Sequence, residues 1–201
     1  MRKPSRWSAL VLLCCAFAIA QQKAAEPAPN VPSISQVLND QLSAVENVFV
    51  PAAEAMSEDK YGFSPTNGEF NGVRTFAQQV KHSATVNYLD FAAIAGEKPP
   101  VDTGIGESGP NSVASKAEIV AYLRDSFAYG HKVLAGVTPQ NATLSITGPN
   151  GRTMTTRLRL ALQVMGHCFD HYGQMVEYLR MNGVIPPASQ RRQPSSSGKK
   201  D

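Results

Sequence analysis

The chain has 201 residues, and its composition, 42% hydrophobic and 17% charged, excludes a disordered chain and a polytopic membrane protein. The net charge of +3 is unevenly distributed, because residues 31–190 contain 11 basic and 14 acidic residues while both ends of the chain are basic. The body of the chain is therefore mildly acidic, and the sequence predicts no basic face for binding nucleic acid.

The first twenty residues have the pattern of a secretory signal. Three basic residues within the first six positions precede a mostly apolar run from Trp7 to Ile19. The small residues Ala18 and Ala20 then have the spacing of a signal-peptidase cleavage site. The run is shorter than the ~20 apolar residues of a membrane span. We predict a signal peptide over 1–20, cleavage after Ala20, and export to the periplasm or the cell exterior with no membrane span left. A lipoprotein signal using Cys14 or Cys15 and an uncleaved anchor are the alternatives.

Two segments flank the predicted domain. Residues 21–32 form a polar linker rich in Ala and Pro, and residues 188–201 form a basic, low-complexity tail that we predict to be disordered. The folded domain then covers 33–187. After signal cleavage Cys168 is the single cysteine, so no internal disulfide is expected.

The first half of this domain predicts two helices. Apolar residues recur at steps of three and four from Ile34 to Met56, after a Ser33 that begins a capping-box pattern, and Pro51 is expected to kink or break the last turns. A loop rich in Gly, Pro and Asn follows, and a second helical pattern runs from Val73 to Phe91.

The second half predicts two more helices. Residues 99–114 are rich in Gly, Pro and Ser, and their length favours a crossover connection or a loop that covers a site. A third helix starts at Ser115, where Glu118 three residues later gives a second capping-box pattern. A short hairpin is expected around Pro149, and the longest helix runs from near Thr153 to Asn182. Four amphipathic helices predict an all-α fold, an antiparallel four-helix bundle with a long connection between helices 2 and 3.

Three of the four histidines are candidate metal ligands. His167 and His171 are four residues apart, so they lie on one face of a helix and could bind one ion, although such a pair is also compatible with ordinary core or surface histidines. No Glu follows His167, which excludes the HExxH arrangement of zinc peptidases. His82 lies in the middle of the second helix and is the candidate third ligand. His131, late in the third helix, is expected to be a surface histidine.

Two segments resemble the DinB-like (damage-inducible) family of metal-binding four-helix bundles. The first is AEAMSEDKYGFSPTNGEFNGVRTFAQQVKHSATVNYL, residues 53–89, and the second is GHCFDHYGQMVEYLRMNGVIPP, residues 166–187. With the helix spacing, the resemblance spans nearly all of 33–187. It implies that His82, His167 and His171 form a metal-binding triad between the second and fourth helices, with open positions for water or substrate.

The triad suggests a divalent transition metal, Zn, Ni or Fe, because three neutral imidazoles with an open position are typical of a catalytic centre. Gln174 could hydrogen-bond a ligand or a water beside the metal, or have only a packing role. Gly173 would allow a close helix approach there. Cys168 is a weaker candidate, because adjacent helix residues point about 100° apart.

Two functions follow as expectations. The first is an exported metal-binding protein of DinB-like type that acts on an unknown small-molecule substrate as a metal-dependent hydrolase or transferase. The alternative is a non-catalytic, metal-stabilised module of the cell envelope that binds a partner or forms a homodimer through its first and fourth helices. The catalytic residues are unknown, and whether the protein is an enzyme stays open.

Overall fold

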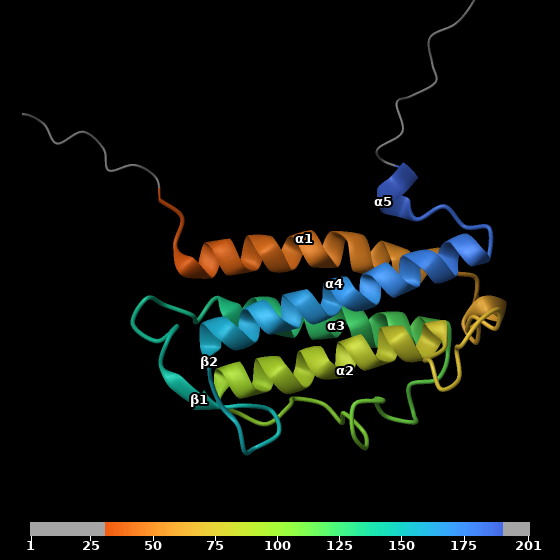
Figure 1. Ribbon diagram of the computed structural model, residues 1–201. Helices are drawn as coiled ribbons and strands as arrows, with labels where there is room; N and C mark the ends of the chain where they lie inside the picture. Colours follow the sequence, from red (N-terminus) through yellow and green to blue (C-terminus); the bar gives the residue numbers. More distant parts are fainter. Residues whose placement is uncertain (1–30, 191–201) are drawn as a thin grey trace, which may run out of the picture. The chain divides into compact units, whose positions relative to one another are not determined.

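The computed structural model describes residues 31–190 and is almost entirely helical (Figure 1). The elements in chain order are α1 (Ile34–Ala55), the short 3-10 helix η1 (Glu58–Lys60), α2 (Phe76–Ala95), α3 (Lys116–Leu134), β1 (Ser145–Thr147), β2 (Met154–Thr156), α4 (Arg157–Met181) and α5 (Pro187–Gln190). The predicted all-α fold is confirmed. The predicted signal peptide, most of the linker and most of the tail lie outside the described residues.

Each of the first three long helices begins with a capping box. Ser33, Thr75 and Ser115 accept a hydrogen bond from the backbone N–H three residues later, and the side chain of that later residue accepts one from the N-cap backbone. These pairs satisfy N–H groups that have no partner within the helix. The boxes at Ser33 and Ser115 were predicted, whereas the Thr75 box moves the start of α2 to Phe76, later than the predicted Val73.

Two local predictions need correction. Pro51 does not break α1, which continues to Ala55 with the proline inside it. The longest helix starts at Arg157 and not near Thr153, because residues 154–156 pair with β1 as an antiparallel strand of the predicted hairpin. At the other end, α5 extends regular structure to Gln190, three residues into the segment predicted as a disordered tail.

The four long helices pack with two pointing each way. The start of α4 contacts the end of α2, where Arg157 Nε donates to the Ile94 carbonyl, so α2 and α4 are antiparallel. The Lys116 ammonium at the start of α3 donates to the Met56 carbonyl just after α1, so α1 and α3 are antiparallel as well. The other two neighbouring pairs, α2 with α3 and α1 with α4, run in the same direction, so the predicted antiparallel bundle also contains parallel neighbours (Figure 1). Residues 96–115 cross the length of the bundle between α2 and α3, which is the predicted crossover.

The core lies between these four helices and consists mostly of aliphatic and phenylalanine side chains. Phe49 of α1 and Phe127 of α3 pack edge to face with ring centroids 6.2 Å apart. Burying aromatic rings of this size contributes much of the stability of such a core. The helix α2 differs from the others, because a row of polar side chains is also buried on it: Gln79, His82, Ser83, Thr85, Asn87 and Asp90.

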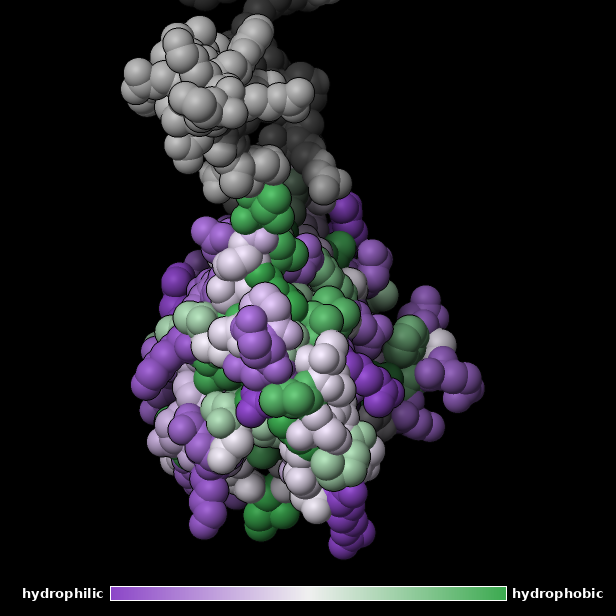
Figure 2. Space-filling model, turned by 90° about the vertical axis from the view of Figure 1, so that its left-hand side faces the viewer, coloured by the Kyte–Doolittle hydropathy of each residue, from purple (hydrophilic) through white to green (hydrophobic). Residues whose placement is uncertain are grey.

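The surface is mixed in character. On the end of the bundle that carries the hairpin, hydrophobic and hydrophilic residues alternate over the face (Figure 2). None of the helices in residues 31–190 is both long and apolar enough to cross a membrane.

Candidate metal centre

The three predicted ligands meet in the interior of the bundle. His82 comes from α2, and His167 and His171 come from adjacent turns of α4. The Nε2 atom of His167 lies 3.1 Å from that of His82 and 3.0 Å from that of His171. A metal at about 2.0–2.1 Å from each of three nitrogens in tetrahedral geometry would hold them about 3.3 Å apart. The cluster therefore has the size of a metal site, and it could hold an ion.

The crossover between α2 and α3 fixes the orientation of His82. The ring is buried, and its Nδ1 lies 2.8 Å from the backbone carbonyl oxygen of Glu107. A carbonyl only accepts, so Nδ1 carries the proton and donates it. The lone pair of His82 is then on Nε2, the atom that faces the other two histidines.

A chain of two amides fixes His171 in the same way. The chain starts at the Asp170 carboxylate, which accepts from Gln174 Nε2 at 3.1 Å. Gln174 Oε1 accepts from Gln79 Nε2 at 2.7 Å, and Gln79 Oε1 lies 2.6 Å from His171 Nδ1. Because the carboxylate end only accepts, each amide is turned so that its oxygen points towards the histidine. Gln79 therefore accepts the Nδ1 proton of His171, and the lone pair of His171 is on Nε2.

With these two ring orientations, the Nε2 atoms at the centre of the cluster have more lone pairs than protons to share. His82 and His171 both direct an Nε2 lone pair towards His167 Nε2, and a single proton on that nitrogen cannot fully satisfy two acceptors. His167 Nδ1 is itself buried and has no hydrogen-bond partner among the described residues. A cation between the three Nε2 atoms would satisfy all three lone pairs at once, so the donor set fits a metal ion.

The electrostatics favour the neutral form of each imidazole. Burial, followed by the charge of the neighbouring histidines, lowers the pKa of His167 to about 4 and that of His171 to about 3. Burial also lowers the pKa of His82, although its hydrogen bond to the Glu107 carbonyl opposes that effect. Metal ligation requires the neutral imidazole, so at pH 7 the three rings are in the state that binds an ion.

The other predicted residues are placed as follows. Gln174 does not reach the histidines directly and acts on His171 through Gln79. Cys168 points away from the cluster and donates to Asn87 Oδ1, and burial raises the pKa of its thiol to about 12. His131 is a partly exposed histidine that contacts Asn39 and Glu46. The expectation for Gly173 is wrong, since an added Cβ there would meet nothing within 4 Å.

Two residues that orient the histidines were not recognised from the sequence. Gln79 lies three residues before His82 and therefore on the same face of α2. This spacing indicates that Gln79 is near His82, but it does not indicate that Gln79 orients His171. Glu107 contributes a backbone carbonyl, which any residue type could supply. No sequence pattern identifies such a contact.

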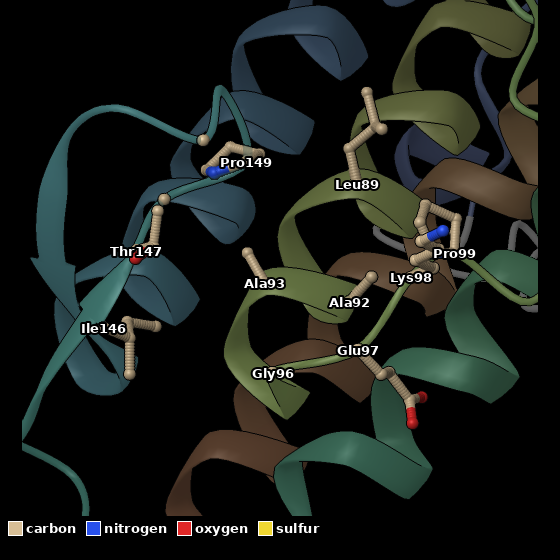
Figure 3. Close-up of a pocket in the computed structure, with 12 residues that line it drawn as sticks. Leu89, Ala92, Ala93, Gly96, Glu97, Lys98, Pro99, Ile146, Thr147 and Pro149 are labelled. Atoms are coloured by element: carbon tan, nitrogen blue, oxygen red, sulfur yellow. The ribbon is translucent and has the colours of Figure 1, made fainter.

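A separate cavity of about 460 Å³ lies between the end of α2 and the hairpin (Figure 3). Leu89 and Ala93 face Ile146 and Pro149 across it, while the Glu97 side chain points away from the hairpin and accepts from the Tyr129 hydroxyl. None of the three histidines lines this cavity. Its lining is mostly apolar, with Lys98 and Thr147 among the polar residues.

Four long helices that bring together three histidines, two buried and one half-buried, define an all-α protein with a candidate metal centre. Residues 41–175 match the sequence model of the DinB superfamily, and the chain belongs to this superfamily. Its fold is similar to the crystal structure of a DinB-like protein from Bacillus subtilis, at 19% identity and a TM-score of 0.57 over 73% of this chain and 92% of that one. A DinB-like protein from Bacillus cereus ATCC 10987 gives 14% identity and a TM-score of 0.58, over 75% and 93%. A comparison with curated protein sequences finds no match.

Proposed function

We propose that the protein is exported and binds one divalent transition metal through His82, His167 and His171, with which it catalyses a hydrolysis or a group transfer on a small molecule. The observation that carries the metal site is that Nε2 of His167 lies 3.0–3.1 Å from Nε2 of His82 and of His171. The lone pairs of His82 and His171 are directed inward, because Nδ1 of each ring donates a hydrogen bond. Zn, Ni and Fe all accept this donor set.

Catalysis is supported by the number of ligands. Three protein ligands leave at least one coordination position for water or substrate, whereas structural zinc sites are closed by four. A metal bound here would act as a Lewis acid or lower the pKa of a bound water. The chain itself holds the three imidazoles in fixed orientations, through the Glu107 carbonyl and through Gln79, so the geometry is set before any ligand arrives.

Metal content tests the site. The mature chain is purified as the wild type and as the His82→Ala, His167→Ala and His171→Ala variants, with His131→Ala as the matched control, and bound metals are measured by mass spectrometry. We expect one equivalent in the wild type and the control and a loss in the other three. Stoichiometric metal in all three variants would overturn the triad, and a fourth protein ligand closing the metal's coordination would favour a non-catalytic module.

Export rests on the sequence of residues 1–20. Its test is the N-terminal sequence of the protein recovered outside the cytoplasm, which we expect to begin at Gln21. A chain that keeps its first twenty residues and stays with the membrane would support the uncleaved anchor, and a lipid-modified cysteine would support the lipoprotein signal.

Dimerisation through α1 and α4 is the second candidate property, and exposed apolar side chains on these helices support it. Val37 of α1 is 51% exposed, and Leu162 and Phe169 of α4 are 56% and 40% exposed. Leu162 and Phe169 are seven residues apart and lie on one face. Light scattering of the wild type should give a dimer and of Leu162→Glu a monomer, with Gln163→Glu as the control of equal charge change. A monomeric wild type would contradict the proposal.

A further inference from the structure

The part of the crossover that contacts His82 is an exposed loop, residues 104–108. Glu107 lies in this loop and its side chain is 62% exposed, so burial of Glu107 does not fix the position of its own carbonyl. That carbonyl oxygen nevertheless lies 2.8 Å from Nδ1 of the buried His82 ring. A hydrogen bond of this length requires that the loop be held against α2 by contacts elsewhere along the crossover.

Lys81, the residue before His82 on α2, supplies a direct contact of this kind. Its ammonium donates to two carbonyl oxygens of the crossover, those of Pro110 and Val113, at 3.2 Å each. Lys81 is half-buried, and among residues 31–190 it forms no ion pair. Partly burying an ammonium without a carboxylate is unfavourable unless hydrogen bonds compensate, so the two carbonyls are what hold this side chain. They lie three and six residues after Glu107, so one side chain ties the end of the loop to α2.

The crossover backbone approaches α2 closely at Gly109. This residue is buried and has a φ of +77°, and a Cβ there would lie 2.7 Å from Cγ of Lys81 and 2.9 Å from Oγ1 of Thr85. Glycine therefore suits this position both for its left-handed backbone and for the space. At the other end of the loop, a Cβ on Gly104 would lie 2.5 Å from the Gly109 carbonyl oxygen. The two ends of the loop thus meet next to the Lys81 side chain.

We propose that Lys81 is a positioning residue of the metal centre, because it fastens the crossover to α2 where the Glu107 carbonyl holds the proton of His82 on Nδ1. The inference rests on the proposed metal site and adds the residue that secures the orientation of one ligand. With the proton on Nδ1, the lone pair of His82 is on Nε2, within the cluster of the three histidines. If the crossover moves away, either ring nitrogen can carry the proton, and part of the protein loses the lone pair that faces the cluster.

The sign of the effect separates positioning from charge. Lys81 carries a positive charge one residue from a ligand of the proposed cation, so removing the charge alone would strengthen metal binding by reducing repulsion. Removing the tether would weaken metal binding, because partners that orient a ligand commonly change affinity by about 10- to 100-fold. Lys81→Met keeps a similar side-chain stem and removes both the charge and the donors, so the two explanations predict opposite changes.

Two pairs of variants test the proposal. Lys81→Met is paired with Lys116→Met, because Lys116 is also half-buried and its ammonium also donates to two carbonyls, at the end of α1. That contact joins α1 and α3, which carry none of the three histidines. Gly109→Ala is paired with Gly72→Ala, because both glycines have a φ of +77° but a Cβ on Gly72 would meet nothing within 4 Å. Gly109→Ala displaces the crossover while the charge of Lys81 stays.

Two measurements are made on each variant. NMR of the imidazole nitrogens in the metal-free protein shows which nitrogen carries the proton, and competition with a chromophoric chelator gives the zinc affinity. The wild type, Lys116→Met and Gly72→Ala should keep the His82 proton on Nδ1 and bind zinc equally. Lys81→Met and Gly109→Ala should move part of the proton to Nε2 and bind zinc about tenfold or more weakly. Lys81→Arg, which keeps the charge and can donate to both carbonyls, should restore both readouts.

Three results would count against the proposal. Lys81→Met that binds zinc as tightly as the wild type or more tightly, with the His82 proton still on Nδ1, would overturn this inference and leave the metal site intact. Weaker zinc binding without any change in the protonated nitrogen of His82 would overturn it as well. A wild type that binds no zinc is a separate result, which would overturn the proposed function and the positioning role with it.

Discussion

The Oε1 atom of Gln79 lies 2.6 Å from Nδ1 of His171, and this contact joins α2 to α4 directly behind the candidate metal centre. Both side chains are buried, at 2% and 5% exposure, so water does not replace the hydrogen bond if it is lost. Because Gln79 is itself turned by Gln174, the contact sets which nitrogen of His171 is free to bind an ion. Hydrogen-bond partners of this kind commonly change metal affinity by about 10- to 100-fold.

The first prediction concerns this partner. Gln79→Ala should weaken zinc binding by about 10- to 100-fold without removing a ligand, because His171 loses the acceptor that keeps its proton on Nδ1. Competition with a chromophoric chelator measures the affinity. Gln163→Ala, an exposed glutamine on α4, is the control and should bind zinc as the wild type does. Equal affinities in both variants would show that Gln79 does not orient the histidine.

The second prediction concerns the metal-free protein in acid. In the unfolded chain each of these histidines has its ordinary pKa of 6.5, while in the fold His167 and His171 have pKa values of about 4 and about 3. Below pH 6.5 the unfolded state therefore binds more protons than the folded state, so acidification favours unfolding. The free energy of unfolding should fall between about pH 6.5 and pH 4, as measured by urea titration.

The control for this effect is the double variant His167→Ala, His171→Ala, which keeps His82 and should show a shallower fall over the same pH range. A fall of equal steepness would mean that other groups titrate. Bound zinc should add a steeper acid dependence of its own, because protons compete with the metal for the imidazole nitrogens.

The third prediction concerns Asp90, a buried carboxyl on the polar face of α2. Burial, with a smaller contribution from the charge of Glu107, raises its pKa from 3.8 to about 7. Between these values the folded state binds the extra proton, so Asp90 weakens the fold progressively as the pH rises. Asp90→Asn removes this cost. The variant should be more stable than the wild type at pH 8, and the difference should shrink towards pH 4. A stability difference independent of pH would contradict the assignment.

The sequence, with the family resemblance, was sufficient for the fold and for the three histidines that come together, but not for the groups around them. Helical periodicity and the Ser33 and Ser115 boxes are local signals, and they located the helices to within a few residues. The pairing of His82 with His167 depended on two helices far apart in sequence, and the DinB-like resemblance supplied it. The roles of Gln79 and of the Glu107 carbonyl arise from contacts across the bundle, which spacing along one helix does not encode.

The direction of the helices shows the same limit. If successive helices alternated in direction, α2 and α3 would be antiparallel. A long connection such as 96–115 instead crosses the length of the bundle, so that α3 runs in the same direction as α2. The length of the segment was visible in the sequence and indicated a crossover. Its contact with His82, through the Glu107 carbonyl, depends on the loop lying along α2, which the sequence does not specify.

The last prediction tests the packing of these two parallel helices at Gly130. A Cβ at Gly130 of α3 would overlap the ring of Phe91 on α2, and that ring is fully buried and cannot move aside into solvent. Gly130→Ala should therefore lower the free energy of unfolding by about 1–3 kcal/mol, because the crowding outweighs the helix propensity gained. Gly173→Ala makes the same change in the middle of α4, where a Cβ meets nothing, and should raise stability by about 0.5–1 kcal/mol. Urea denaturation of the two variants gives the comparison, and a stabilised Gly130→Ala would contradict the close approach of α2 and α3.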